Sequence, residues 1–136
     1  MDLQSFQSQH DAIVQGIDEL RRLTHAGVAE NATEIAHAIV GISSIIKVHL
    51  AAEDRVLYPQ AGQCGDADIV RLAQRFQKDM GPLAERFVAF VKQWNTPQAV
   101  RKQPDAFRAD ANTVMHALWD RIRHENAEFY PRLKAL

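Results

Sequence analysis

The sequence predicts an all-α protein built as an antiparallel, up-down-up-down four-helix bundle. Four long segments carry apolar residues at intervals of three and four, which is the spacing of one helical face. No segment alternates apolar and polar residues with a period of two, so strands are not expected. The connections are mostly short, about 5–10 residues, as in bundles whose successive helices are antiparallel. We expect residues 1–136 to form a single domain.

The first two predicted helices are separated by Gly27. The first runs from about Gln4 to Thr24. The second opens at Asn31, which is expected to cap the helix together with Glu34 three residues later. It is expected to end at Tyr58-Pro59, because proline lacks the amide hydrogen that a continuing helix needs. The predicted apolar faces consist of Phe6, Ile13, Ile17 and Leu20, and of Ile35, Ile39, Ile42, Ile46 and Val56.

The third predicted helix begins near Asp66 and reaches Trp94. Gly81-Pro82 lies inside it and is expected to bend it. A short helical turn at Thr96-Pro97 leads to the fourth helix. That helix extends from near Pro104 to around Pro131, and its apolar face consists of Phe107, Ala111, Met115, Leu118, Ile122 and Phe129.

The composition excludes several classes of protein. The net charge is −1 and the basic residues are dispersed, so neither nucleic acid nor an anionic membrane is an expected partner. Ser43, Ser44, Lys47 and His49 interrupt the longest apolar stretches, which argues against a membrane span. With one cysteine and no signal-peptide pattern at the N-terminus, a cytoplasmic location is expected.

The second and fourth helices end in a repeated pattern. Glu53 and Glu125 are each followed by three residues, then Leu or Phe, then Tyr-Pro. The repeat suggests two helical hairpins packed with rough two-fold symmetry, with the two glutamates at similar depth. Each glutamate also falls on the apolar face of its helix, where a carboxylate is costly unless it is paired, protonated or bound to a metal.

Two histidines join these glutamates on the predicted inward faces. His10 lies on the face of the first helix, and His49 lies four residues before Glu53, so their side chains share one helical face. Imidazole and carboxylate are ligands that suit iron, manganese or zinc, and helical bundles build metal sites from such residues. The candidate metal ligands are therefore His10, His49, Glu53 and Glu125.

Residues 49–59, His-Leu-Ala-Ala-Glu-Asp-Arg-Val-Leu-Tyr-Pro, resemble the second-helix motif of hemerythrin-like HHE domains. His10-Asp11 is similar to the first histidine of that family, and residues 125–131 are similar to its fourth-helix motif. The resemblance implies a four-helix bundle with a non-haem iron centre, mononuclear or dinuclear, that binds or senses iron, dioxygen or nitric oxide. It also implies His10, His49 and Glu53 as iron ligands, with Glu53 in the bridging role.

The sequence departs from the family pattern at two helices. The third helix offers no histidine, and Phe76 and Met80 occupy its inward positions. In the fourth helix, the repeat puts Arg121 where the second helix has His49. His116, His124 and Glu128 would join the site only if the fourth helix were rotated from the predicted register.

Two interpretations of the site therefore stay open. In the first, a metal ion is held by the four candidate ligands, and the partner is that ion or a small diatomic ligand. In the second, no metal is bound, and Arg121 bridges a carboxylate in a structural or interaction module. A homodimer is compatible with both. The shortage of ligands favours binding or sensing over an enzymatic role.

Overall fold

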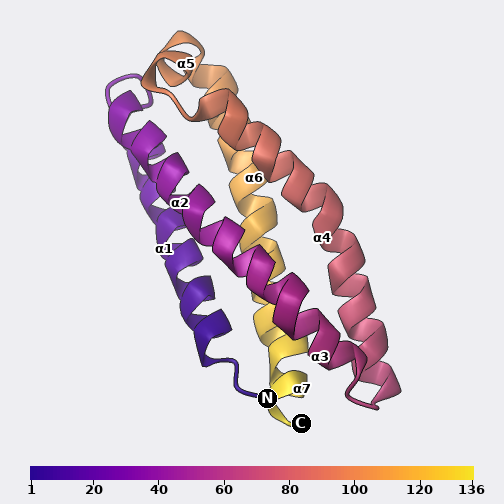
Figure 1. The fold of residues 1–136 in the computed structure, drawn as a ribbon. Helices are drawn as coiled ribbons and strands as arrows, with labels where there is room; N and C mark the ends of the chain where they lie inside the picture. The colour runs from indigo at the N-terminus through magenta and orange to yellow at the C-terminus, as the bar shows by residue number, and fades with distance from the viewer.

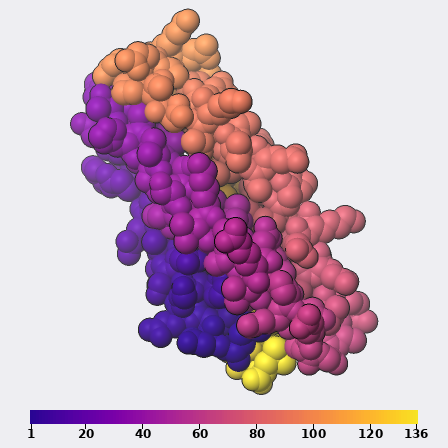
Figure 2. Space-filling view, viewed as in Figure 1, coloured from indigo at the N-terminus to yellow at the C-terminus, as the bar shows by residue number.

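The computed structural model describes residues 1–136 and contains helices but no strand, which confirms the predicted all-α class. Long helices run antiparallel in chain order, and both termini lie at the same end of the bundle (Figure 1). In the space-filling view, α2 and α4 cover most of α6, and the C-terminal residues emerge at the end with the termini (Figure 2). The α-helices are α1 (Gln4–Ala26), α2 (Ala32–Ala52), α3 (Tyr58–Gly62), α4 (Ala67–Trp94), α5 (Pro97–Lys102), α6 (Pro104–His124) and α7 (Tyr130–Lys134).

The predicted helix ends at Pro59 and Pro131 are wrong. The second helix continues through a π-helical turn, η1 (Glu53–Leu57), into α3, and the fourth continues through η2 (Glu125–Phe129) into α7. Each proline falls in the first turn of the short helix that follows, where a missing amide hydrogen is tolerated. The π-turn also shifts the buried face by one residue. Leu57 is buried, whereas Val56, which we predicted on that face, is exposed.

The connection between α1 and α2 depends on glycine. Gly27 has a φ of 135°, a value that residues with a side chain rarely adopt. Asn31 stands at the N-terminus of α2 as predicted, but its side chain does not cap the helix and donates to the Gly27 carbonyl instead, at 2.8 Å. Gly16 allows α1 and α2 to pack closely, because a Cβ there would lie 2.6 Å from Cγ1 of Ile42.

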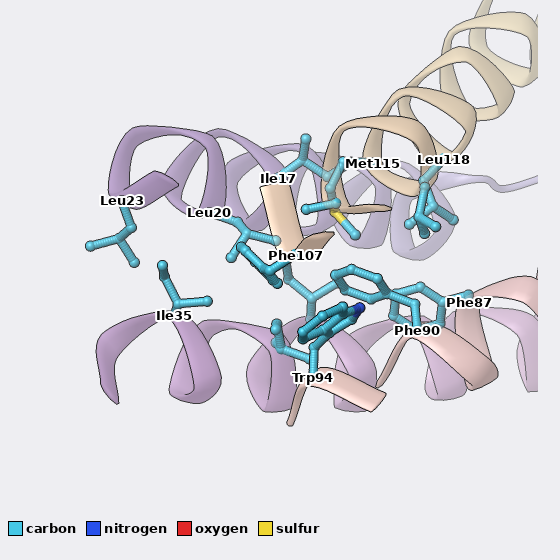
Figure 3. Close-up of a cluster of buried hydrophobic side chains, with 14 of the residues drawn as sticks. Ile17, Leu20, Leu23, Ile35, Phe87, Phe90, Trp94, Phe107, Met115 and Leu118 are labelled. Carbon is cyan, nitrogen blue, oxygen red and sulfur yellow. The ribbon is translucent and has the colours of Figure 1, made fainter. Parts of the chain in front are cut away.

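The buried core has two apolar parts with a polar layer between them. A cluster of 20 residues fills the half of the bundle near α5, and part of it is seen in Figure 3. A cluster of 11 residues fills the end that carries the termini. Along α1 the chain passes from Phe6 in the smaller cluster, through His10, to Ile13 in the larger one. Five of the six buried polar side chains lie at this level: His10, His49, Glu53, Arg121 and Glu125.

The continuous helical segment Ala32–Gly62 is long and apolar enough to cross a membrane, by length and composition alone. The polar interruptions noted in the sequence therefore do not exclude a span. Core helices of bundles pass the same test, however, and the isoleucines of α2 pack in the larger core cluster.

Candidate metal centre

The four predicted ligands meet inside the bundle. His10 comes from α1, His49 from α2, Glu53 from the start of η1 and Glu125 from the start of η2. One ligand atom from each residue lies within 4.8 Å of the others. None of the four residues is more than 4% exposed, so the group is closed to bulk solvent.

The two π-turns set the orientation of this group. The Tyr58 amide donates to the Glu53 carbonyl, and the Tyr130 amide donates to the Glu125 carbonyl, five residues back in each case. In a π-helical turn, the residue five positions after the glutamate lies close to the same side of the helix. In an α-helix, that residue would point to another side. As a result, each tyrosine of the repeated pattern returns to the side of the helix that carries its glutamate.

The outer nitrogens of both histidines are held by amide oxygens. His49 Nδ1 lies 2.7 Å from Gln9 Oε1, and His10 Nδ1 lies 2.8 Å from Asn126 Oδ1. Because an amide oxygen only accepts, each Nδ1 carries the hydrogen and donates it. In the neutral ring this leaves a lone pair on each Nε2, which is the arrangement that second-shell partners impose on metal-binding histidines.

Those lone pairs face each other. The Nε2 atoms of His10 and His49 are 3.1 Å apart, His49 Nε2 is in contact with Glu53 Oε1, and His10 Nε2 lies 3.6 Å from Glu125 Oε1. A shared proton or a cation must lie between His49 Nε2 and Glu53 Oε1, since two acceptors in contact cannot satisfy each other. The second carboxylate oxygen of Glu53 and that of Glu125 have no hydrogen-bond partner. The donor set therefore fits a metal ion.

Arg121 forms one wall of the group. Its Nε donates to Glu125 Oε1 at 3.2 Å, Nη1 to the Phe76 carbonyl at 2.6 Å, and Nη2 to the Tyr58 hydroxyl at 2.6 Å. The guanidinium also lies over the Phe76 ring, 4.8 Å from its centroid. Arg121 thus pairs with one carboxylate, Glu125, and forms no hydrogen bond or ion pair with the Glu53 carboxylate or the two histidines, so the arrangement is compatible with either interpretation of the sequence.

The charges of the layer act on the pKa values of its members. Burial alone would lower the pKa of His10, but the hydrogen bond and charge of Glu125, together with Asn126, raise it above the ordinary value. Burial alone would raise the pKa of Glu53, but His49 and Arg121 outweigh this and lower it. Burial and the nearby carboxylates raise the pKa of Tyr58 and of Tyr130, so both hydroxyls keep their hydrogens. The Tyr130 hydroxyl lies within hydrogen-bond distance of His10 Nε2, 3.1 Å away.

A small cavity adjoins the group. Its volume is about 20 Å³, which is enough for one water-sized molecule. His49, Glu53, Glu125 and Arg121 form its polar side, and the opposite side is apolar, with Ile13, Ile46, Leu50, Met80, Leu118 and Ile122.

The other polar residues of α6 and η2 named in the sequence lie outside the group. His116 is exposed and stacks on Trp119, His124 is exposed beside Asp120, and Glu128 pairs with Arg75 at 2.9 Å. The register predicted for the fourth helix is therefore the one observed. Sequence reasoning missed Gln9 and Asn126, although each is adjacent to a candidate ligand. Tyr58 and Tyr130 also belong to the polar layer, through Arg121 and His10 respectively, and the repeat places both at a fixed distance from a glutamate.

Comparison with known proteins gives one match. The hemerythrin HHE cation binding domain matches residues 1–133, which is nearly the whole chain. No curated protein and no solved structure matches it. The chain therefore belongs to the hemerythrin HHE cation-binding domain family, and its buried histidine and glutamate cluster is able to hold a metal ion.

Proposed function

We propose that the protein holds one non-haem iron ion at His10, His49, Glu53 and Glu125 and uses it to bind or sense a small diatomic molecule, dioxygen or nitric oxide. The observation that carries this proposal is the convergence of four buried acceptor atoms within 4.8 Å, with both histidine Nδ1 atoms already engaged. Two imidazoles and two carboxylates suit iron, manganese and zinc. Membership of the cation-binding family supports a bound metal ion, and the resemblance of residues 49–59 to hemerythrin-like motifs is the reason for proposing iron.

A single ion is proposed because Arg121 occupies the place where the ligand of a second metal ion would stand. Arg121 stands where the repeat would have a histidine, and its positive charge already neutralises Glu125 from the outer side. α4 supplies Phe76 and Met80 rather than ligands at its inward positions. Two carboxylates against one guanidinium leave a formal charge of −1, which a divalent ion or a proton on a histidine offsets.

The small cavity supports the choice of ligand. Iron(II), when bound, supplies a coordination position that dioxygen or nitric oxide can take. A cavity of about 20 Å³ lined by three of the proposed ligands, His49, Glu53 and Glu125, suits a molecule about the size of water and excludes much larger ones. Arg121 contributes a fixed positive charge to the cavity wall, which favours ligands that carry or acquire negative charge.

The test is metal content after anaerobic addition of iron(II), followed by absorption spectra before and after nitric oxide or air. We expect about one iron per chain and a spectral change with the diatomic ligand. His49→Ala removes one of the two imidazole ligands and should bind no iron. His37→Ala, an exposed histidine on the same helix, should bind it normally. Protein that stays free of iron, manganese and zinc after reconstitution contradicts the proposal.

One observation favours a second function, that of a metal-free structural or interaction module. The Arg121 network is complete without an ion, because each of its three donor nitrogens has a partner. On this alternative the shared proton between His49 and Glu53 is permanent. The same metal analysis separates the two functions, since the module would bind no ion and His49→Ala would change stability only.

A further inference from the structure

A second hollow lies in the other half of the bundle, between α1 and α6. Its volume is about 320 Å³, within the range of small-molecule sites. Its lining includes Leu20 of α1 and Met115 of α6, each ten residues along its helix from a candidate metal ligand, or about 15 Å at 1.5 Å per residue. The hollow is therefore separate from the metal centre.

The base of the hollow is apolar and belongs to the core. Leu20, Ala111 and Met115 are all buried, and Figure 3 shows Leu20 and Met115 among the side chains directed into the larger cluster. Alanines at positions 109 and 111 of α6 face the hollow in place of larger side chains. The hollow is open because these two side chains on α6 are small.

The rim of the hollow is cationic. Arg21 and His25 are four residues apart on α1, and Arg108 faces them from α6, whereas no acidic side chain lines the hollow. Arg21 and His25 form no ion pair, in contrast to the neighbouring Arg22, which pairs with Glu19 at 2.6 Å. Arg108 has only a loose contact with Asp105, at 3.7 Å, and both side chains are exposed. Basic groups placed four apart on a helix repel each other when charged, so their proximity costs stability unless an anion offsets it.

We propose that this hollow is a binding site for a small amphipathic carboxylate, with its apolar body on Leu20 and Met115 and its carboxylate against Arg21 and Arg108. Charge complementarity selects an anion, and the planar fork of arginine matches a carboxylate in two-point contact. The apolar base selects a ligand with a hydrocarbon or aromatic body over a small inorganic ion. The site binds independently of any metal.

The experiment uses octanoate as the probe, octanol as its uncharged equivalent and isothermal calorimetry as the readout. We expect saturable binding of one octanoate per chain and binding of octanol that is weaker by about tenfold or more. The double variant Arg21→Gln/Arg108→Gln should lose octanoate affinity by a similar or larger factor. Ala109→Phe, a substitution of an exposed residue, should fill the hollow and abolish binding with the fold unchanged by circular dichroism.

Arg86→Gln is the matched control, because it removes an exposed arginine of α4 outside the hollow. It should leave octanoate affinity unchanged. The proposal is overturned by the absence of saturable binding at millimolar octanoate, by equal affinities for octanoate and octanol, or by equal losses in Arg86→Gln and the double variant.

Discussion

The end of the second helix and the end of the fourth have the same backbone conformation, but they differ in the side chain that faces the glutamate. In each, a glutamate opens a π-helical turn that leads into Tyr-Pro and a final helical turn. Four residues before that glutamate stands His49 in one helix and Arg121 in the other. Two helix ends with the same conformation therefore give their glutamates different chemical partners. One carboxylate faces a base that can exchange a proton for a metal, and the other is bound to a cation that cannot leave.

The largest expected change comes from giving the end of the fourth helix the histidine of the second, together with one further histidine on α4. In Arg121→His/Met80→His, two new imidazoles would join the unpartnered carboxylate oxygens of Glu53 and Glu125, beside the small cavity. We expect metal content to rise from one ion to two per chain, measured by elemental analysis after reconstitution. Arg121→Leu removes the guanidinium without adding a ligand and should stay at one ion or fewer. A double variant that still binds one ion would show that Arg121 does not occupy a second metal position.

The next effect concerns stability at the arginine end. Arg121→Ala would leave Glu125 buried without its guanidinium partner, together with the Phe76 carbonyl. Loss of one partner of a buried ion pair costs about 3–5 kcal/mol. We expect that decrease in the free energy of unfolding of the metal-free protein, measured with urea. Arg123→Ala breaks an exposed, solvent-screened pair with Asp120 and should leave the free energy of unfolding nearly unchanged. Equal urea midpoints for wild type and Arg121→Ala would rule out a structural role for the network.

A smaller effect is expected from the amides behind the two histidines. Gln9→Leu and Asn126→Leu each remove the oxygen that holds one Nδ1 hydrogen. Loss of such a partner lowers metal affinity by about 10–100-fold. Competition with a chromophoric chelator measures this change. Gln7 lies on the same helix as Gln9 and forms no hydrogen bond with a histidine, so Gln7→Leu should keep the wild-type affinity. If the Gln9 and Asn126 variants also kept it, the two rings would be oriented by packing alone.

The smallest expected effect is the pH dependence of the free energy of unfolding. His10 should lower stability as pH rises, and Glu53 should lower it as pH falls. Glu125 raises the pKa of His10, so the stabilisation from protonated His10 is complete below pH 6.5, the unfolded value, and is lost as pH rises through the folded pKa. The lowered pKa of Glu53 stabilises the protein above pH 4.5, and this is lost as pH falls through its folded pKa. Urea unfolding of the metal-free protein across this range measures both. Glu125→Gln should abolish the loss on the alkaline side and keep the loss on the acid side.

The metal affinity should increase with rising pH, over the same range in which the stability of the metal-free protein decreases. An ion at His10 displaces the proton there, so affinity increases as pH rises through the raised pKa of His10. Affinity that is constant between pH 6 and 8 would contradict the assignment of His10 as a ligand.

The helices and the inward-facing polar residues could be predicted because both follow from periodicity. His10, His49, Glu53 and Glu125 each continue an apolar face, so their burial was evident from spacing, and the structure brings them together. The π-turns could not be predicted in this way. Tyr-Pro is a common helix stop, and a widened turn that carries the helix past proline leaves no separate mark in the sequence. The roles of Gln9 and Asn126 were also hidden, because they depend on which neighbouring helix each ring faces.

The burial of the four candidate ligands has a consequence for the kinetics of metal exchange. With exposures of 4% or less, none of these side chains can be reached by a chelator while the bundle is closed. An ion held there leaves only when helices separate locally, so its residence time is governed by the opening rate of the bundle rather than by the strength of the bonds alone. The small cavity of about 20 Å³ beside the candidate ligands admits a diatomic molecule far more readily than a hydrated cation. Gas exchange and metal exchange would then proceed on separate timescales within one fold.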